Sequence, residues 1–421
     1  MEKKSTFKPV DKSERLHVLD ALRGFAIFGI LMINIQFFSG YSYMMDDVQS
    51  QLLLGDWNTF FNRLHAVFFR GKFYTLFSLL FGIGFAIQFV RASSTDRSFT
   101  VHFSRRLFFL LLIGLVHLWA IWFIDILVLY ALCGFVLILF KGFSNRGLLL
   151  AAFLILLLPG LNSWYLNAYD GGYTTALYQL LSESWRDLNI PVESDEYTTF
   201  RVYDISAAIQ SDSWRTFFSF NYLGPLLRGY MVSLDGRVFK VLGIFVIGLW
   251  IGRQLLINKI HENRPFLIRT AIVGLLIGIP MNIIFAMDDP FMLENSWYPI
   301  VQETITTFRY IILTAGYVAL FMLLFHTDLK GILNRMFSAV GRTALSNYIL
   351  QSIIGIFLFY GVGLGLGKHL GLALLTLFVV IIFLFQIAIS ELWLKRYKYG
   401  PLEWIWRVLT YGRYMKNRIE K

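Results

Sequence analysis

Charged residues are scarce in this sequence of 421 residues, of which only 15% are Asp, Glu, Lys or Arg. Soluble chains carry about 25% charged residues, because a folded surface in water needs them. Hydrophobic residues make up 57% of the chain and aromatic residues 17%. The composition therefore excludes an ordinary soluble domain and predicts an all-α polytopic membrane protein, with aromatic side chains at the membrane interfaces and on lipid-facing surfaces.

Cysteine is nearly absent, since Cys133 is the only one and lies inside an apolar run. One thiol can form neither an internal disulfide nor a zinc cluster, so we expect no metal site. The sequence also lacks a Walker A, HExxH or GxSxG motif. The glycine series at 361–367 follows an apolar span with no strand before it, which indicates an external turn rather than a phosphate-binding loop.

The net charge of +11 would suggest a nucleic-acid partner in a soluble domain. Here the basic residues cluster in short segments between apolar runs, so they indicate topology, and we expect no nucleic acid. Anionic membrane lipid or a phosphorylated ligand are the expected partners. Every second connection is basic, whereas the polar segment 167–215 is acidic, which places that segment outside. We therefore expect about ten spans with both termini in the cytoplasm.

The expected organisation has two membrane halves of five helices each. The segment 57–69 is predicted to be an amphipathic helix, 217–234 to be interfacial or re-entrant, and the fifth span to break at Pro159-Gly160. The expected domains are a cytoplasmic segment 1–19, a membrane half 20–166, an extracytoplasmic part 167–235, a second half 236–394 and a basic tail 395–421. The expected spans are 21–38, 73–90, 107–124, 125–140, 147–165, 238–257, 270–287, 306–325, 337–360 and 370–394.

Two ionisable residues, His117 and Asp125, interrupt the long apolar stretch 105–140. One helix of that length would be more than about 50 Å long, so the stretch is better divided into two spans at Asp125, which can cap the second helix. His117 then lies about 16 Å above Arg106, near the middle of the membrane. An ionisable group at that depth is a candidate functional residue. The alternative is a structural hydrogen bond for His117 and a simple cap for Asp125.

The ninth span carries five polar side chains within an apolar helix: Arg342, Ser346, Asn347, Gln351 and Ser352. They predict either a polar wall around a ligand channel or amides that bond neighbouring helices. Four arginines fall near the cytoplasmic surface, where they can bind the phosphates of a cytosolic ligand or serve only as positive-inside residues. They are Arg23, Arg105, Arg106 and Arg342.

Several segments carry a resemblance that runs in order along nearly the whole chain. They are RLHVLDALRGFAIFGILMIN at 15–34, GKFYTLFSLLFGIGFA at 71–86, RRLFFLLLIGLVHLWAIWFIDILVLYALCG at 105–134, GRTALSNYILQS at 341–352 and GPLEWIWRVLTYGR at 400–413. On these residues the chain resembles the YeiB-like family of bacterial membrane proteins (domain of unknown function 418), within a superfamily of transmembrane acyltransferases. The resemblance implies a multi-pass protein of the bacterial cytoplasmic membrane.

The resemblance also implies an activity, because such acyltransferases bind acyl-coenzyme A from the cytosol and pass the acyl group to a small-molecule or glycan acceptor on the other side. The bacterial O-acyltransferases have an arginine followed eleven residues later by a catalytic histidine, a spacing that runs here from Arg23 to Asn34. The lysosomal heparan N-acetyltransferase has asparagine at that place and its histidine in the following loop. In this chain the following loop holds no histidine until His65, which the resemblance implies as the counterpart if the loop folds back.

Three functions remain open from the sequence. In a membrane acyltransferase, His117 with Asp125 would act as the base, His65 would be the next candidate, and Asn34 would bind the thioester oxygen. Acyl-coenzyme A would be held by Arg23, Asn34, Arg105, Arg106, Arg342, Asn347 and Gln351. The alternatives are a transporter of a small molecule or lipid precursor, in which the pair relays protons, and a non-catalytic membrane scaffold or sensor. A homodimer is left open as the assembly.

Overall fold

A computed structural model describes residues 17–91, 96–191, 203–257, 262–287 and 297–419. Within these ranges the chain is built from helices, and its only β-type pairings are two isolated bridges, at Leu53–Leu370 and Tyr397–Arg418. The predicted all-α polytopic membrane fold is confirmed. Most of the predicted cytoplasmic segment 1–19 and the acidic loop at Asp288-Asp289 lie outside the described residues.

Eight helices of the described part are long and apolar enough to cross a membrane. Two shorter apolar helices stand at the places of the fourth and ninth predicted spans. The long helices are α1 (His17–Phe38), α4 (Lys72–Arg91), α5 (Asp96–Ala120), α7 (Asn145–Ala168), α12 (Arg237–Ile257), α13 (Arg264–Met287), α14 (Tyr298–Phe325) and α18 (Leu372–Leu394). The short ones are α6 (Leu127–Leu137), which η4 (Ile138–Gly142) continues, and α17 (Ala344–Phe359).

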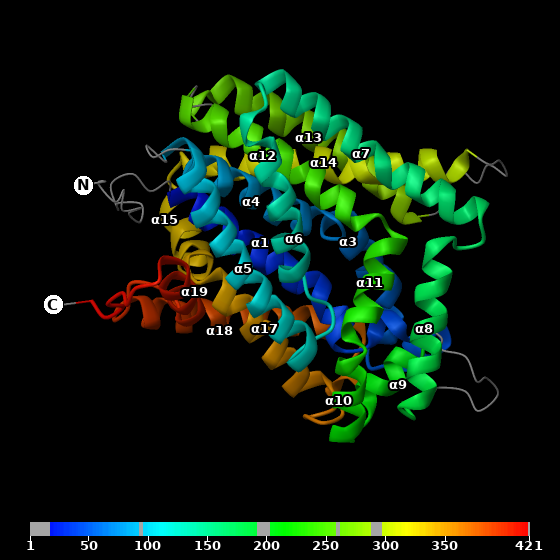
Figure 1. The fold of residues 1–421 in the computed structure, drawn as a ribbon. Coiled ribbons are helices and arrows are strands. Elements are labelled where there is room, and N and C mark those ends of the chain that lie inside the picture. Colours follow the sequence, from blue (N-terminus) through cyan, green and yellow to red (C-terminus); the bar gives the residue numbers. More distant parts are fainter. Residues whose placement is uncertain (1–16, 92–95, 192–202, 258–261, 288–296, 420–421) are drawn as a thin grey trace.

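The remaining helices gather toward the two ends of the bundle (Figure 1). The expected amphipathic helix is present as α3, and the 217–234 segment forms two helices, α10 and α11. At one end lie η2 (Tyr41–Tyr43), α2 (Asp46–Gln51), η3 (Gly55–Trp57), α3 (Asn58–Phe68), α8 (Tyr173–Asp187), α9 (Asp204–Gln210), α10 (Trp214–Tyr222), α11 (Gly224–Leu234) and η7 (Leu366–Lys368). At the other lie α15 (Lys330–Leu333), η6 (Asn334–Ser338), α16 (Ala339–Arg342) and α19 (Pro401–Tyr411).

The fifth span differs from its prediction, because α7 continues through Pro159 without a break. A proline is tolerated inside a membrane helix where neighbouring elements hold the helix in place. Gly160 supplies that contact, since a Cβ there would lie 2.5 Å from Thr304 Oγ1 and 2.9 Å from the Ile300 carbonyl oxygen of α14. The predicted break at Pro159-Gly160 is therefore wrong.

The ninth span is also not the single helix that was predicted. The chain leaves helical geometry at Thr343, with φ −117° and ψ 34°, and α17 begins at the next residue. Glu403 of α19 caps this new N-terminus, because its Oε1 accepts from the amides of Leu345 at 2.7 Å and Ser346 at 3.1 Å. Its Oε2 accepts from the Ser346 hydroxyl at 2.6 Å. The predicted basic tail thus contains a helix that packs back onto the bundle.

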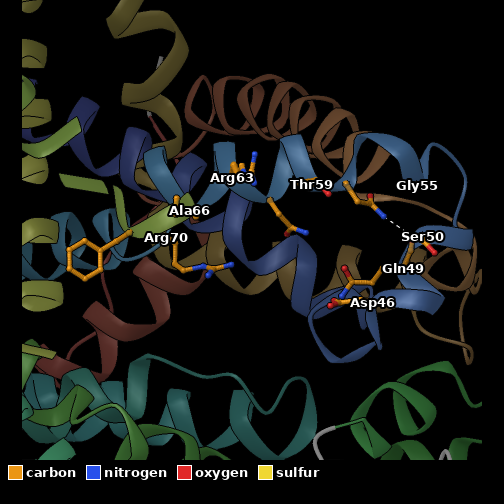
Figure 2. A pocket seen from close by; sticks show the side chains of 12 residues that line it. Asp46, Gln49, Ser50, Gly55, Thr59, Arg63, Ala66 and Arg70 are labelled. Atoms are coloured by element: carbon orange, nitrogen blue, oxygen red, sulfur yellow. Dashed lines mark hydrogen bonds between the residues drawn. The ribbon is translucent and has the colours of Figure 1, made fainter. Parts of the chain in front are cut away.

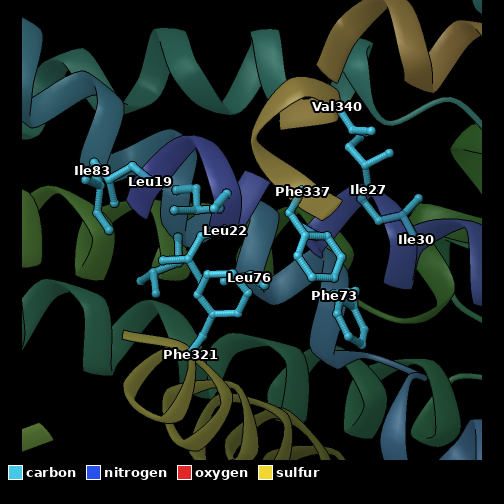
Figure 3. Packing of buried hydrophobic residues seen from close by; sticks show 14 of the residues in the cluster. Leu19, Leu22, Ile27, Ile30, Phe73, Leu76, Ile83, Phe321, Phe337 and Val340 are labelled. Atoms are coloured by element: carbon cyan, nitrogen blue, oxygen red, sulfur yellow. The ribbon is translucent and has the colours of Figure 1, made fainter. Parts of the chain in front are cut away.

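Helix α1 lies at the centre of the bundle and packs against helices from both halves of the sequence. Figure 3 shows its side chains, such as Leu22 and Ile27, beside Phe73 of α4, Phe321 of α14 and Phe337 of η6. The backbone of α1 also lies close to that of α16. A Cβ on Gly341 of α16 would overlap the Asp20 carbonyl oxygen and lie 2.7 Å from the Gly24 nitrogen. Glycines permit this approach between membrane helices.

The sidedness of the bundle remains a prediction, and cysteine accessibility tests it. With Cys133 replaced by Ala, a cysteine at Asp195 is expected to react with a membrane-impermeant maleimide in intact cells. A cysteine at Lys416 is expected to react only after permeabilisation, because basic connections stay inside. Equal labelling of both positions from outside would contradict the topology.

Candidate functional site

The turn between α5 and α6 forms the centre of the site. Helix α5 ends at Ala120 and α6 begins at Leu127, so a non-helical segment separates them. Asp125 lies in this segment, and its Oδ2 accepts from the Val128 amide at 2.6 Å, which caps α6 as predicted. Helix α5 ends before Ile124, the residue at which it was expected to end. The amide of Trp122 donates to the His117 carbonyl at 2.8 Å, which closes the helix at this point. This break lets His117 and Asp125 meet.

His117 is hydrogen bonded through both ring nitrogens. Its Nδ1 is 2.9 Å from Asp125 Oδ1, and its Nε2 is 2.9 Å from Ser352 Oγ of α17. The three residues are buried, with exposed fractions of 0%, 1% and 0% for His117, Asp125 and Ser352. An ionised carboxylate only accepts, which assigns the proton of the neutral imidazole to Nδ1. Ser352 then donates its hydroxyl proton to Nε2.

Neighbouring side chains hold the turn in this geometry. The Arg228 Nε of α11 donates to the Asp125 carbonyl at 2.8 Å, and the Tyr348 hydroxyl donates to the Ile124 carbonyl at 3.3 Å. The Tyr348 ring lies 5.2 Å from the His117 ring. Gly224, at the start of α11, lies against α5. A Cβ added to Gly224 would be 3.0 Å from the Leu118 carbonyl oxygen. The segment 217–234, predicted to be interfacial or re-entrant, thus covers the end of the α5–α6 hairpin.

This arrangement has the parts that proton transfer needs. A histidine is an efficient base near neutral pH, and a carboxylate on its other nitrogen orients the ring and stabilises the cation that forms. A hydroxyl on Nε2 is the group that such a base deprotonates. Sequence reasoning found His117 and Asp125 but assigned no role to Ser352, although it noted Ser352 among the polar residues of the ninth span. The contact joins residues 235 positions apart, which no local pattern predicts.

His65 lies elsewhere and has both nitrogens occupied. Its Nε2 is 3.0 Å from Thr376 Oγ1, and that hydroxyl donates its own proton to the Leu372 carbonyl at 2.7 Å. Nε2 must therefore donate, and Nδ1 accepts from the Gln36 amide at 2.7 Å. His65 is fully buried. These contacts fit a structural histidine that joins α3, α1 and α18.

The amides of α17 bond to α18. Asn347 Nδ2 donates to Ser390 Oγ at 2.9 Å, and Gln351 Nε2 donates to Gln386 Oε1 at 2.9 Å. Gln386 returns a bond of 2.9 Å to the Asn347 carbonyl. The geometry matches the alternative in which these amides join neighbouring helices. Asn34 is half-buried on α1, and within the described residues no hydrogen bond connects it to His117, Asp125 or Ser352.

A basic cluster forms around Arg106, near the middle of α5 and about three helical turns before His117. Arg106 Nη1 donates to Gln88 Oε1 at 3.1 Å, and its guanidinium lies 4.1 Å from the ring centre of Trp406 in α19. Arg23 and Arg407 are electrostatic neighbours of Arg106.

Arg23 is paired with Asp20 at 3.0 Å. Arg105 packs at Gly412, where a Cβ would lie 2.8 Å from its Nη2. Arg342 Nη2 donates to the Lys398 carbonyl at 3.4 Å. The structure thus brings Arg23 and Arg106 together, with Arg105 beside α19 and Arg342 near the start of the C-terminal segment.

The fold and site define an all-α polytopic membrane protein with a buried histidine, carboxylate and hydroxyl. Residues 251–413 match the family described as "Protein of unknown function (DUF418)". The chain is 29% identical over 420 residues to "Uncharacterized protein YxaH" of Bacillus subtilis, covering 97% of each chain. It is 28% identical over 410 residues to "Uncharacterized protein YeiB" of Escherichia coli, covering 94% of this chain and 96% of the relative. These matches support the resemblance to the YeiB-like, DUF418 proteins, and the relatives are bacterial.

Proposed function

We propose that this protein is a membrane acyltransferase that passes an acyl group from cytosolic acyl-coenzyme A to a hydroxyl or amine acceptor at the extracytoplasmic side. The observation that carries the proposal is the position of His117 between Asp125 and Ser352, with both hydrogen bonds at 2.9 Å. A base held by a carboxylate and bonded to a hydroxyl is the arrangement that acyl transfer to an alcohol requires. The resemblance to a transmembrane acyltransferase superfamily supports the same class.

The reaction would proceed by transfer of one proton and one acyl group. His117 Nε2 takes the proton from the acceptor as the acceptor attacks the thioester carbonyl. The carbon–sulfur bond breaks, and the proton passes from His117 to the leaving thiolate, which gives the acyl product and free coenzyme A. The Asp125 carboxylate at Nδ1 stabilises the imidazolium that forms during the transfer. The Ser352 hydroxyl marks the position from which a proton reaches Nε2.

The basic cluster around Arg106 of α5 would bind the phosphates of the donor. Arginine forks form strong charge-assisted hydrogen bonds with phosphate. Arg106 and His117 are eleven residues apart on one helix, or about 16 Å along its axis. The arm of coenzyme A would extend over this distance to bring its thioester to the histidine.

Charge reversal of Arg105 and Arg106 together is expected to weaken acyl-coenzyme A binding at least about tenfold, because a hydrogen bond to a charged group contributes roughly 1.5–3 kcal/mol. Calorimetry on the purified protein measures the affinity. A matched control reverses Arg146 and Arg264, two exposed cations in other connections, and is expected to bind normally. Unchanged affinity in the first variant would contradict the donor site.

The activity itself is tested with the full chain in lipid nanodiscs. Release of coenzyme A from acetyl-coenzyme A, followed with a thiol reagent in the presence of a bacterial envelope extract, is the expected result. A second candidate function is a transporter, which is favoured by the burial of two ionisable residues inside the bundle, since such groups mark proton relays in membrane transporters. Solute-dependent proton uptake by proteoliposomes, without release of coenzyme A, would support the transporter instead.

A further inference from the structure

The amphipathic helix α3 has one face that points into a cavity. The residues of this face recur at intervals of three and four, which aligns them along one side of a helix. Its opposite face exposes the apolar side chains of Trp57, Phe60 and Phe68, and a third face is buried with His65. The residues on the cavity face are Thr59, Asn62, Arg63 and Ala66, and Arg70 reaches the same cavity from the turn that follows the helix.

The cavity has a volume of about 450 Å³ and lies between α3, α2 and the end of α13. Figure 2 shows Arg63 of α3 and Arg70 just beyond it, with Asp46 and Gln49 of α2 toward the far end. Hydrogen-bonding amides and hydroxyls complete the lining on that side. The other lining residues are Ser50, Gly55, Asn58, Phe285 and Ala286.

Two further basic side chains lie directly behind the cavity wall. Lys72 Nζ donates to the carbonyl of Ala66 at 2.7 Å, and Lys72 is fully buried. The Arg309 guanidinium lies 4.4 Å from the ring centre of Phe285. Lys72 and Arg309 thus contact two residues that line the cavity. The Arg309 Nε is buried and has no hydrogen-bond partner.

The cavity is surrounded by an excess of positive charge. Arg70 and Arg309 both lie near Lys72, so their guanidinium groups flank the same part of the cavity wall. Among the described residues, Arg63, Arg70 and Arg309 form no ion pair with a carboxylate. Asp46 is the single acid in the lining. Like charges at close range disfavour one another, so an anion in the cavity would stabilise this arrangement.

The surroundings place the cavity beside a membrane surface. Trp57 and Phe60 on the opposite face of α3 are 55% and 54% exposed. Aromatic side chains of this kind collect at the level of the lipid headgroups. A ligand anchored in the bilayer could therefore present an anionic group to Arg63 and Arg70.

We propose that this cavity binds a phosphate group, carried either by a lipid headgroup or by a free ion. Arg63 and Arg70 contact the phosphate with their guanidinium forks. Arg309 supplies positive charge from behind the wall. Phosphate binding here does not require acyl transfer, so a failure of the proposed function would leave this site unaffected.

The experiment uses the purified full chain and two probes. Calorimetry measures binding of inorganic phosphate in detergent, and lipid mass spectrometry measures phosphatidylglycerol retained from nanodiscs that contain equal phosphatidylglycerol and phosphatidylcholine. The native protein is expected to bind at least one probe, and Arg63→Gln/Arg70→Gln to bind it at least about tenfold more weakly, since two charge-assisted hydrogen bonds are lost. Retention of phosphatidylglycerol alone identifies a headgroup site, whereas binding of inorganic phosphate identifies a site for the free ion.

A matched control separates this site from general surface charge. Arg186→Gln/Arg215→Gln removes two exposed cations outside the cavity and is expected to bind like the native chain. Both arginines of the cavity are exposed, so the test variant should melt like the native protein. Binding of neither probe by the native chain, full binding by the cavity variant, or equal loss in the control would each overturn the proposal.

Discussion

Replacement of His117 by Gln is expected to lower acyl transfer by about 10²–10⁴-fold, the usual contribution of a general base. Glutamine can donate and accept hydrogen bonds, so it can partly replace the contacts to Asp125 and Ser352, but it cannot take up a proton at neutral pH. His117→Ala is expected to lose turnover as well. The measurement is release of coenzyme A by each purified variant, beside its melting temperature and its affinity for the donor.

The comparison of the two His117 variants separates catalysis from structure. If His117 were only a structural hydrogen-bonding residue, His117→Gln would keep its turnover and His117→Ala would melt at a lower temperature. His65→Gln is the matched control, because His65 is also fully buried with both nitrogens bonded. We expect it to retain turnover. Full activity in His117→Gln would exclude His117 as the base and make His65 the next candidate.

A methyl group added at Gly341 is expected to destabilise the fold by about 3 kcal/mol, at the upper end of the usual cost of overpacking a core. The reason is that the Cβ would overlap the Asp20 carbonyl oxygen and lie 2.7 Å from the Gly24 nitrogen, both backbone atoms of α1. Backbone cannot rotate away as a side chain can. Thermal melting of Gly341→Ala in detergent, followed by circular dichroism, measures the effect.

Gly331→Ala provides the control for this substitution. Gly331 lies in the nearby helix α15, and a Cβ built there meets nothing within 4 Å. Its melting temperature is expected to equal or slightly exceed that of the native chain, since alanine favours a helix over glycine by roughly 1 kcal/mol. Equal melting of Gly341→Ala and Gly331→Ala would show that α1 and α16 do not pack at backbone contact.

Most helices were predictable because the bilayer imposes a simple rule on them. A span needs about 20 mostly apolar residues, so composition alone locates the helix between Lys72 and Arg91 or between Leu372 and Leu394. The same rule fails where other parts of the chain decide. Pro159 stays inside a helix because α14 packs against Gly160, and the helix before Thr343 ends where Glu403 caps the next one. Neither contact can be inferred from a local pattern.

The candidate site was predictable to the same extent. His117 and Asp125 stood out because ionisable groups are rare inside a membrane, and the helix break between them was foreseen from the length of the apolar stretch. Ser352 could not be assigned to them, since serine is common in membrane helices and only the packing of α17 against the hairpin turn brings it to Nε2. The amides Asn347 and Gln351 looked alike in sequence but bond to α18 instead.

The cap that Glu403 places on α17 makes the C-terminal helix α19 a link between α17 and α5. Helix α19 holds the start of the helix that carries Ser352, and its Trp406 indole also donates to the Arg106 carbonyl of the helix that carries His117, at 2.9 Å. The helices that carry His117 and Ser352 are therefore both bonded to one short helix, α19, at the end of the bundle away from the imidazole. A ligand or protein that displaces α19 would shift α5 and α17 against each other and change the distance between Nε2 and the hydroxyl.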